Sequence, residues 1–114
     1  MLELRDLRRR FGDIIALDGL SFDARPGRLL GFLGPNGAGK TTAMRSIFGI
    51  VRPDSGTVSW QGHEVTRSAR QRFGYMPEQR GLYPKMACAD QLAYFARTRG
   101  LDPTASRAAA ERWL

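Results

Sequence analysis

The sequence predicts an α/β fold in which an antiparallel β layer lies beside a parallel sheet. Three observations predict it. Two stretches near the start alternate apolar and polar residues, a short and mainly apolar run occupies residues 28–33, and a glycine-rich loop then leads into a helical pattern. Alternation is typical of strands with one buried face, whereas a continuous apolar run is typical of a parallel strand buried on both faces. The 114 residues are enough for one small hydrophobic core.

The alternating stretches are expected to form the antiparallel layer. The first lies in residues 2–7 and the second in residues 20–24, with leucine or phenylalanine at most of the apolar positions. Pro26-Gly27 closes the second stretch as a turn. A third alternating stretch, residues 57–60, follows a cluster of turn-forming residues at 52–56.

Residues 34–42 read Gly-Pro-Asn-Gly-Ala-Gly-Lys-Thr-Thr, which fits the pattern G-x-x-x-x-G-K-[S/T] of a P-loop through Gly34, Gly39, Lys40 and Thr41. The glycines let the backbone bring its N–H groups against phosphate oxygens, and a helix beginning at about Lys40 adds its positive dipole end. Lys40 is expected to place its charge on the β- and γ-phosphates, and the Thr41 hydroxyl is a hard oxygen ligand for Mg²⁺. The apolar run before the loop and the helical spacing after it favour nucleotide binding over a ligand-free turn.

The remaining elements follow in order. Residues 66–72 are polar and fit either a short helix or a loop, and residues 73–76 are predicted as a second core strand. Residues 89–98 are expected to form a helix, and Asp102-Pro103 is a typical start for another. Cys88 falls on the apolar face of the first of these helices, which predicts a small buried packing residue rather than a nucleophile.

Composition limits the classes of protein. The sequence has no apolar run near the length needed to cross a bilayer, no secretory signal, and a single cysteine, so a cytosolic location fits. The net charge of +7 suits either a nucleic-acid or anionic-lipid surface or an arginine-rich surface of solvated charges. Arg8-Arg9-Arg10 is the only tight basic cluster, and no RNA-binding or zinc-finger pattern accompanies it, so a nucleic-acid partner is not favoured.

Taken together, these motifs resemble the ATP-binding subunit of ABC transporters. The stretches that carry the resemblance are residues 16–22, 26–27, 34–42, 53–62 and 73–85. The resemblance covers the whole chain in order, and residues 77–85 are most similar to bacterial export-type subunits. It implies that residues 1–114 are the N-terminal part of a nucleotide-binding domain of the P-loop NTPase class, ending within the start of its helical subdomain.

The resemblance also implies roles for individual residues. Phe11 matches the aromatic residue that stacks on adenine, with packing inside the β layer as the alternative. The phosphates are expected to be wrapped by residues of the loop and the first helical turn, namely Gly34, Asn36, Gly37, Ala38, Gly39, Lys40, Thr41 and Thr42.

Where the family usually has a glutamine that reaches Mg²⁺ and the attacking water, this chain has Glu78, followed by Gln79. Glu78 is expected to serve as a metal ligand and, with Lys40, as a catalytic residue, because its carboxylate still offers oxygen to Mg²⁺. Gln79 takes the role only if the loop shifts register. The alternative is that both residues are plain exposed polar residues.

For the whole protein, the resemblance implies ATP hydrolysis that drives transport by a separate transmembrane permease subunit at the cytoplasmic face of the cell membrane. Two copies of the ATPase domain are expected to enclose two MgATP. Up to Leu114 the sequence has no match to four further elements of the family: the signature motif, the Walker B aspartate, the catalytic glutamate and the switch histidine. This chain alone is therefore expected to bind nucleotide without significant hydrolysis. Two alternatives stay open: a soluble ABC-type ATPase acting on the ribosome or DNA, and a non-catalytic nucleotide-binding fragment.

Overall fold

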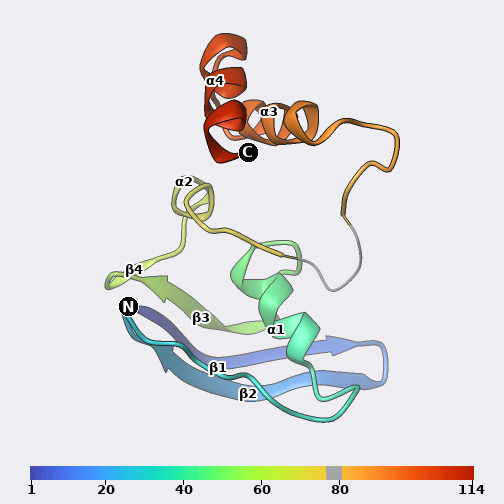
Figure 1. Cartoon of the computed structure of the whole chain (residues 1–114). Coiled ribbons are helices and arrows are strands. Elements are labelled where there is room, and N and C mark those ends of the chain that lie inside the picture. Colours follow the sequence, from blue (N-terminus) through green and yellow to red (C-terminus); the bar gives the residue numbers. More distant parts are fainter. Residues whose placement is uncertain (77–80) are drawn as a thin grey trace. The chain divides into compact units, whose positions relative to one another are not determined.

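The computed structural model describes residues 1–76 and 81–114, and the chain divides into two compact units, Met1–Phe73 and Gly74–Leu114. The first unit contains a four-stranded sheet with strand order β2-β1-β3-β4 (Figure 1). The strands are β1 (Leu2–Phe11), β2 (Ile14–Ala24), β3 (Ser55–Trp60) and β4 (His63–Glu64), and all described pairs are antiparallel. Helix α1 (Lys40–Ile47) lies along the sheet and packs against it, which confirms the predicted β layer and the helix after the loop (Figure 1).

The core of the first unit lies between the sheet and α1. Leu4 and Leu7 on β1 are fully buried, and Ala43 and Ile47 reach them from α1. The other buried members of this cluster are Leu17, Val58 and Val65. Burial of these aliphatic side chains is the main force that holds the helix on the sheet.

A bulge in β1 explains how two leucines three positions apart can share one face. Leu4 pairs with Phe22 and Leu7 with Leu20, so three steps on β1 oppose two on β2. The bulge lies at Asp6, whose φ is 47° and whose N–H donates to Ser21 Oγ at 2.8 Å. The extra residue restores the core-facing direction of Leu7, which strict alternation from Leu4 does not give.

Truncation of Leu7 to alanine is expected to lower the free energy of unfolding by about 2–5 kcal/mol, since it removes a fully buried side chain and leaves a cavity. Urea unfolding followed by circular dichroism measures this. Ile14→Ala is the matched control, because Ile14 is 70% exposed and its truncation is expected to change stability by less than about 0.5 kcal/mol. Equal losses in the two variants would contradict the placement of the core.

The structure differs from the sequence prediction at two apolar segments. Residues 28–33 and 73–76 are not strands, and Leu29 and Leu33 are almost fully exposed. A strand requires a neighbour to accept and donate its backbone hydrogen bonds, and no strand pairs with either segment in the described ranges. The parallel sheet that these segments predicted is therefore not formed by the residues the structure describes.

Helix α2 (Arg67–Arg70) resolves the choice left open for residues 66–72 in favour of a short helix. The Thr66 hydroxyl caps it by accepting from the Ala69 N–H at 3.2 Å. This hydroxyl satisfies one of the N–H groups that lack a partner at a helix start.

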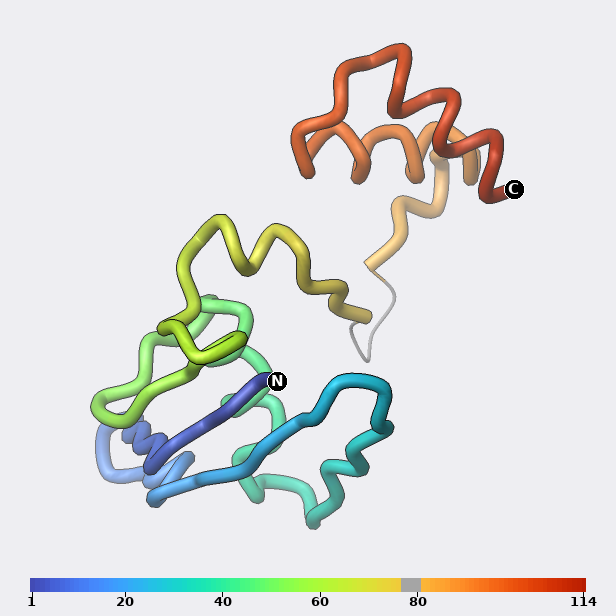
Figure 2. Tube along the Cα trace, turned by 90° about the vertical axis from the view of Figure 1, so that its left-hand side faces the viewer, coloured from blue at the N-terminus to red at the C-terminus, as the bar shows by residue number. Residues whose placement is uncertain are grey.

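The second unit holds α3 (Cys88–Thr98) and α4 (Pro103–Trp113), which lie against each other (Figure 2). Asp102 caps α4 as predicted, accepting from the Ala105 N–H at 2.9 Å. The prediction for Cys88 is wrong, because this residue is exposed at the first turn of α3. The buried residue of α3 is instead Gln91, which accepts from the Tyr83 N–H and donates to the Met86 carbonyl. Among the described residues, the structure has no helix with the length and apolar character to cross a membrane.

Candidate nucleotide-binding site

The glycine-rich loop is fixed to the sheet at Gly39, where the loop meets α1. Gly39 has φ of 84° and is the residue that precedes the helix. A Cβ at this position would overlap the Ala16 carbonyl oxygen on β2 and lie 3.0 Å from Leu17 Cδ2. Glycine is therefore required here for two reasons, its backbone conformation and the close approach of the β2 backbone.

The apex of the loop is open rather than packed. Gly37 has the same φ of 84°, yet a Cβ there would have no heavy atom within 4 Å. Asn36 and Gly37 form a turn, and the Ala38 N–H donates to the Pro35 carbonyl at 3.2 Å. The loop thus combines a fixed base with an accessible backbone at its tip.

Lys40 brings a positive charge back over this loop. Its Nζ donates to the Gly34 carbonyl at 2.5 Å and to the Pro35 carbonyl at 2.7 Å. The side chain therefore folds toward the loop instead of extending into solvent. An ammonium group has three N–H donors, so one remains for a further acceptor beside the loop.

The N-terminus of α1 provides a second positive feature. No side chain caps this helix end, and its first turn contains no acidic residue. The first N–H groups of a helix have no intrahelical acceptor, and the helix dipole places partial positive charge at this end. Thr41 is exposed in that turn and Thr42 is half-buried, with the Thr42 carbonyl accepting from Ser46 Oγ at 2.9 Å. The glycine-rich loop, Lys40 and the uncapped start of α1 together form a site suited to bind a chain of phosphates, which we call the phosphate cradle.

Phe11 lies at the end of β1 and is 44% exposed. The Arg9 guanidinium sits over its ring, with Cζ 4.5 Å from the ring centroid. Arg9 pairs across the strands with Leu17, the same residue that approaches Gly39. Cross-strand partners point to one face of a sheet, so Arg9 and the ring it contacts lie on the face that carries the loop and α1.

Of the two predicted Mg²⁺ ligands, Thr41 and Glu78, the structure describes Thr41. Thr41 offers an exposed hydroxyl at the helix start, and Mg²⁺ commonly takes one or two protein oxygens beside phosphate and water. No group of three histidine, cysteine, aspartate or glutamate side chains that could hold a metal is found in residues 1–76 and 81–114. Glu78, the other predicted metal ligand and catalytic residue, and Gln79 lie outside the described residues.

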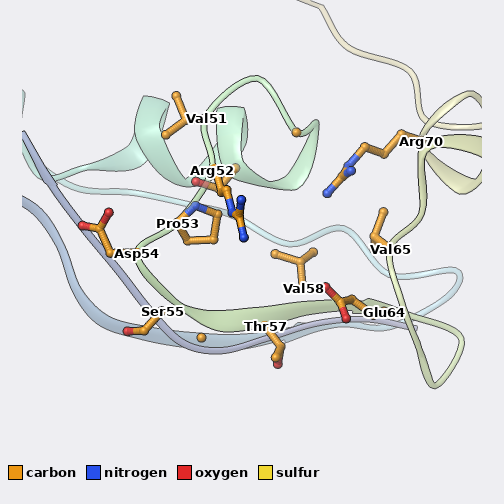
Figure 3. A pocket seen from close by; sticks show the side chains of 13 residues that line it. Val51, Arg52, Pro53, Asp54, Ser55, Thr57, Val58, Glu64, Val65 and Arg70 are labelled. Atoms are coloured by element: carbon orange, nitrogen blue, oxygen red, sulfur yellow. The ribbon is translucent and has the colours of Figure 1, made fainter.

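A separate hollow of about 530 Å³ lies between the C-terminal end of α1, the turn before β3 and the last residue of α2 (Figure 3). Arg52, Glu64 and Arg70 line it, and Arg70 Nε donates to the Ile47 carbonyl at 3.1 Å. None of the loop residues from 34 to 42 lines this hollow. Its charges are mixed, so it does not form part of the phosphate cradle.

The sequence reasoning missed two residues of this region, Arg9 and Asp54. Asp54 Oδ1 accepts from Arg9 Nη1 at 2.7 Å, and Oδ2 accepts from the Arg10 N–H at 2.7 Å. The Arg10 N–H and then the Arg9 guanidinium lower the pKa of Asp54 below its ordinary value, although partial burial opposes them. The sequence did contain a signal for Arg9. Arg9 and Phe11 are two positions apart on a strand, and this spacing places both side chains on one face.

Comparison with known proteins defines the class. The ABC transporter family profile matches residues 17–114, and the chain therefore belongs to the ABC transporter family. Over 114 residues the chain is 42% identical to an uncharacterized ABC transporter ATP-binding protein, YhaQ, of Bacillus subtilis, covering 100% of this chain and 38% of that protein. It is also 42% identical over 110 residues to a Nod factor export ATP-binding protein I of Burkholderia pseudomallei, covering 94% of this chain and 36% of that protein.

A solved structure of an ATP-binding subunit of an ABC transporter superposes with a TM-score of 0.77 at 29% identity, over 91% of this chain and 45% of that one. The fold is therefore that of the ATP-binding proteins of this family, which confirms the predicted α/β class of P-loop NTPases. The chain spans well under half the length of these curated relatives.

Proposed function

We propose that this chain binds the triphosphate of ATP with its glycine-rich loop, as part of a transporter ATP-binding subunit. The observation that carries the proposal is the arrangement at the start of α1, where Lys40 Nζ folds over the loop and no side chain caps the helix. Backbone N–H groups of residues 36–42 would contact the phosphate oxygens. A Cβ added at Gly34 would lie 3.4 Å from Ala38 Cβ and 3.9 Å from Lys40 Cδ, so glycine at this position leaves room for the Lys40 side chain beside the loop.

Lys40 would exchange its loop carbonyls for β- and γ-phosphate oxygens, which are stronger acceptors because they carry charge. Thr41 would place its hydroxyl oxygen on Mg²⁺, and Glu78 is proposed to offer a second oxygen. When bound, Mg²⁺ would neutralise part of the negative charge on the phosphates. Thr42 adds an N–H and a hydroxyl to the end of the phosphate chain.

The proposed partners are a transmembrane permease subunit and a second ATPase domain, with the assembly at the cytoplasmic face of the cell membrane. Support comes from the relatives that are named as ATP-binding proteins of ABC transporters and of Nod factor export. In the whole protein, ATP binding and hydrolysis would drive transport by the permease. The 114-residue chain alone is proposed to bind ATP without significant turnover. Co-purification of the intact protein tests the partner: a membrane permease supports the proposal, whereas ribosomes or DNA would contradict it.

Phe11→Ala is expected to weaken MgATP binding by about 1–3 kcal/mol, because the base loses an aromatic face on which to stack. Inorganic tripolyphosphate lacks a base, so its affinity is expected to stay unchanged. Calorimetric titration with both ligands measures the difference. Phe95→Ala is a matched control, since Phe95 is 38% exposed but lies on α3 in the other unit. Equal weakening of both ligands in Phe11→Ala would show that the ring only packs.

A further inference from the structure

We propose that Arg9, held in place by Asp54, is a positioning residue that covers one face of the Phe11 ring and so directs the opposite face toward the adenine base. The inference rests on the proposed function, because it concerns how the same ring meets ATP. It assigns a role to a salt bridge between the end of β1 and the turn before β3, two segments far apart in the sequence.

Asp54 ties the end of β1 to that turn through three hydrogen bonds. Its carboxylate accepts from Arg9 Nη1 and from the Arg10 N–H, each at 2.7 Å, and its own N–H donates to the Arg8 carbonyl at 2.8 Å. Backbone and side chain thus both fix the position of Asp54 (Figure 3 shows it at one end of the hollow). A carboxylate held in this way determines where the guanidinium can lie.

The geometry of Arg9 shows that its position is set by the ring as well as by Asp54. Arg9 Nε is buried and has no hydrogen-bond partner among the described residues. An unmet N–H of this kind is unfavourable, so another interaction must offset it. The ring of Phe11 supplies one, because its face attracts the guanidinium at 4.5 Å from the centroid.

The consequence for Phe11 is that its two faces are no longer equivalent. Arg9 occupies one face, while the side chain remains 44% exposed. Arg9 also lies opposite Leu17, which approaches the base of the loop at Gly39, so the ring stays on the loop side of the sheet. Phe11 pairs with Ile14, two residues along β2 from Ala16, a separation of about 7 Å along the strand. A nucleoside attached to phosphates at the loop can span such a distance, and the free ring face is where its base would stack.

The test compares MgATP with inorganic tripolyphosphate in the protein and its variants. Arg9→Ala is expected to weaken MgATP about 3–30-fold, because without a cation–π contact of this strength the Phe11 ring is no longer held in the position for stacking, and to leave tripolyphosphate unchanged. Arg9→Lys keeps the charge but loses the planar group, so we expect an intermediate loss. Arg8→Ala is the matched control: this neighbouring arginine pairs with Asp6 and Asp18, and its removal is expected to change neither affinity.

Asp54→Asn provides a second route that leaves Arg9 in the sequence. The amide oxygen can still accept from the Arg10 N–H, but the charge that holds Arg9 is lost, so MgATP is expected to weaken while tripolyphosphate does not. A double-mutant cycle between Arg9→Ala and Phe11→Ala should show a coupling of at least threefold in MgATP affinity. Strict additivity, or equal losses for both ligands, would overturn the inference. If the single substitution Phe11→Ala leaves MgATP affinity unchanged, the assignment of Phe11 to the adenine base is wrong. If Phe11→Ala weakens MgATP but Arg9→Ala and Asp54→Asn do not, only the role proposed for Arg9 is wrong.

Discussion

Lys40→Ala is expected to abolish MgATP binding measurable by calorimetry. In the structure, Lys40 Nζ lies against the loop through the Gly34 and Pro35 carbonyls, and it is the lysine of the cradle. A hydrogen bond to a charged group contributes about 1.5–3 kcal/mol, so losing contacts to two phosphates lowers affinity by a factor of 100 or more, in order of magnitude. Tripolyphosphate binding is expected to fall equally, because the lost contacts are to phosphate and not to the base.

The chain offers a matched control in its other lysine, Lys85, which is exposed in the second unit. Lys85→Ala removes the same charge from the molecule, and we expect unchanged MgATP affinity. Thermal unfolding of both variants separates loss of binding from loss of folding. Retained affinity in a folded Lys40→Ala protein would refute the phosphate assignment.

Gly39→Ala is expected to disrupt both the loop and the stability of the protein. A non-glycine residue in the left-handed region costs about 1–2 kcal/mol. At Gly39 the added methyl group would also overlap the Ala16 carbonyl oxygen, so the loop has to move off β2. We therefore expect a loss in the free energy of unfolding beyond that range and loss of MgATP binding, measured by urea unfolding and calorimetry.

Gly37→Ala separates these two effects, because its φ is the same 84° but a methyl group there meets no atom within 4 Å. This variant is expected to lose only the conformational term of about 1–2 kcal/mol. A Gly39→Ala protein no less stable than Gly37→Ala would show that the contact between loop and β2 does not fix the site.

Much of the fold could be predicted where the residue pattern within one short segment is enough to determine its secondary structure. Alternation identified residues 2–7 of β1, 20–24 of β2 and 57–60 of β3, and the Asp102-Pro103 pair identified the start of α4. Other features depend on groups distant in sequence. The bulge at Asp6 depends on its pairing with β2 and β3, and residues 28–33 are apolar enough for a buried strand but have no strand beside them in the described ranges.

The candidate site divides in the same way. The loop from Gly34 to Thr42 is a continuous motif, so its sequence was sufficient to locate it. The environment of Phe11 was not predictable, because Arg9 and Asp54 meet only once β1 and the turn before β3 are brought together. The Pro-Asp-Ser-Gly stretch predicts only that Asp54 lies in a turn. Its side-chain hydrogen bonds to β1 depend on the tertiary structure, which the local sequence does not reveal.

The most direct test of the central proposal is a titration of the isotopically labelled protein with MgATP, followed through backbone amide chemical shifts. We predict that the largest changes fall on residues 36–42, with further changes at Phe11 and Arg9 and little change in α3 and α4. Tripolyphosphate should reproduce the changes in the loop but not those at Phe11. Saturable shifts confined to α3 and α4, or no shifts at millimolar MgATP, would contradict the account.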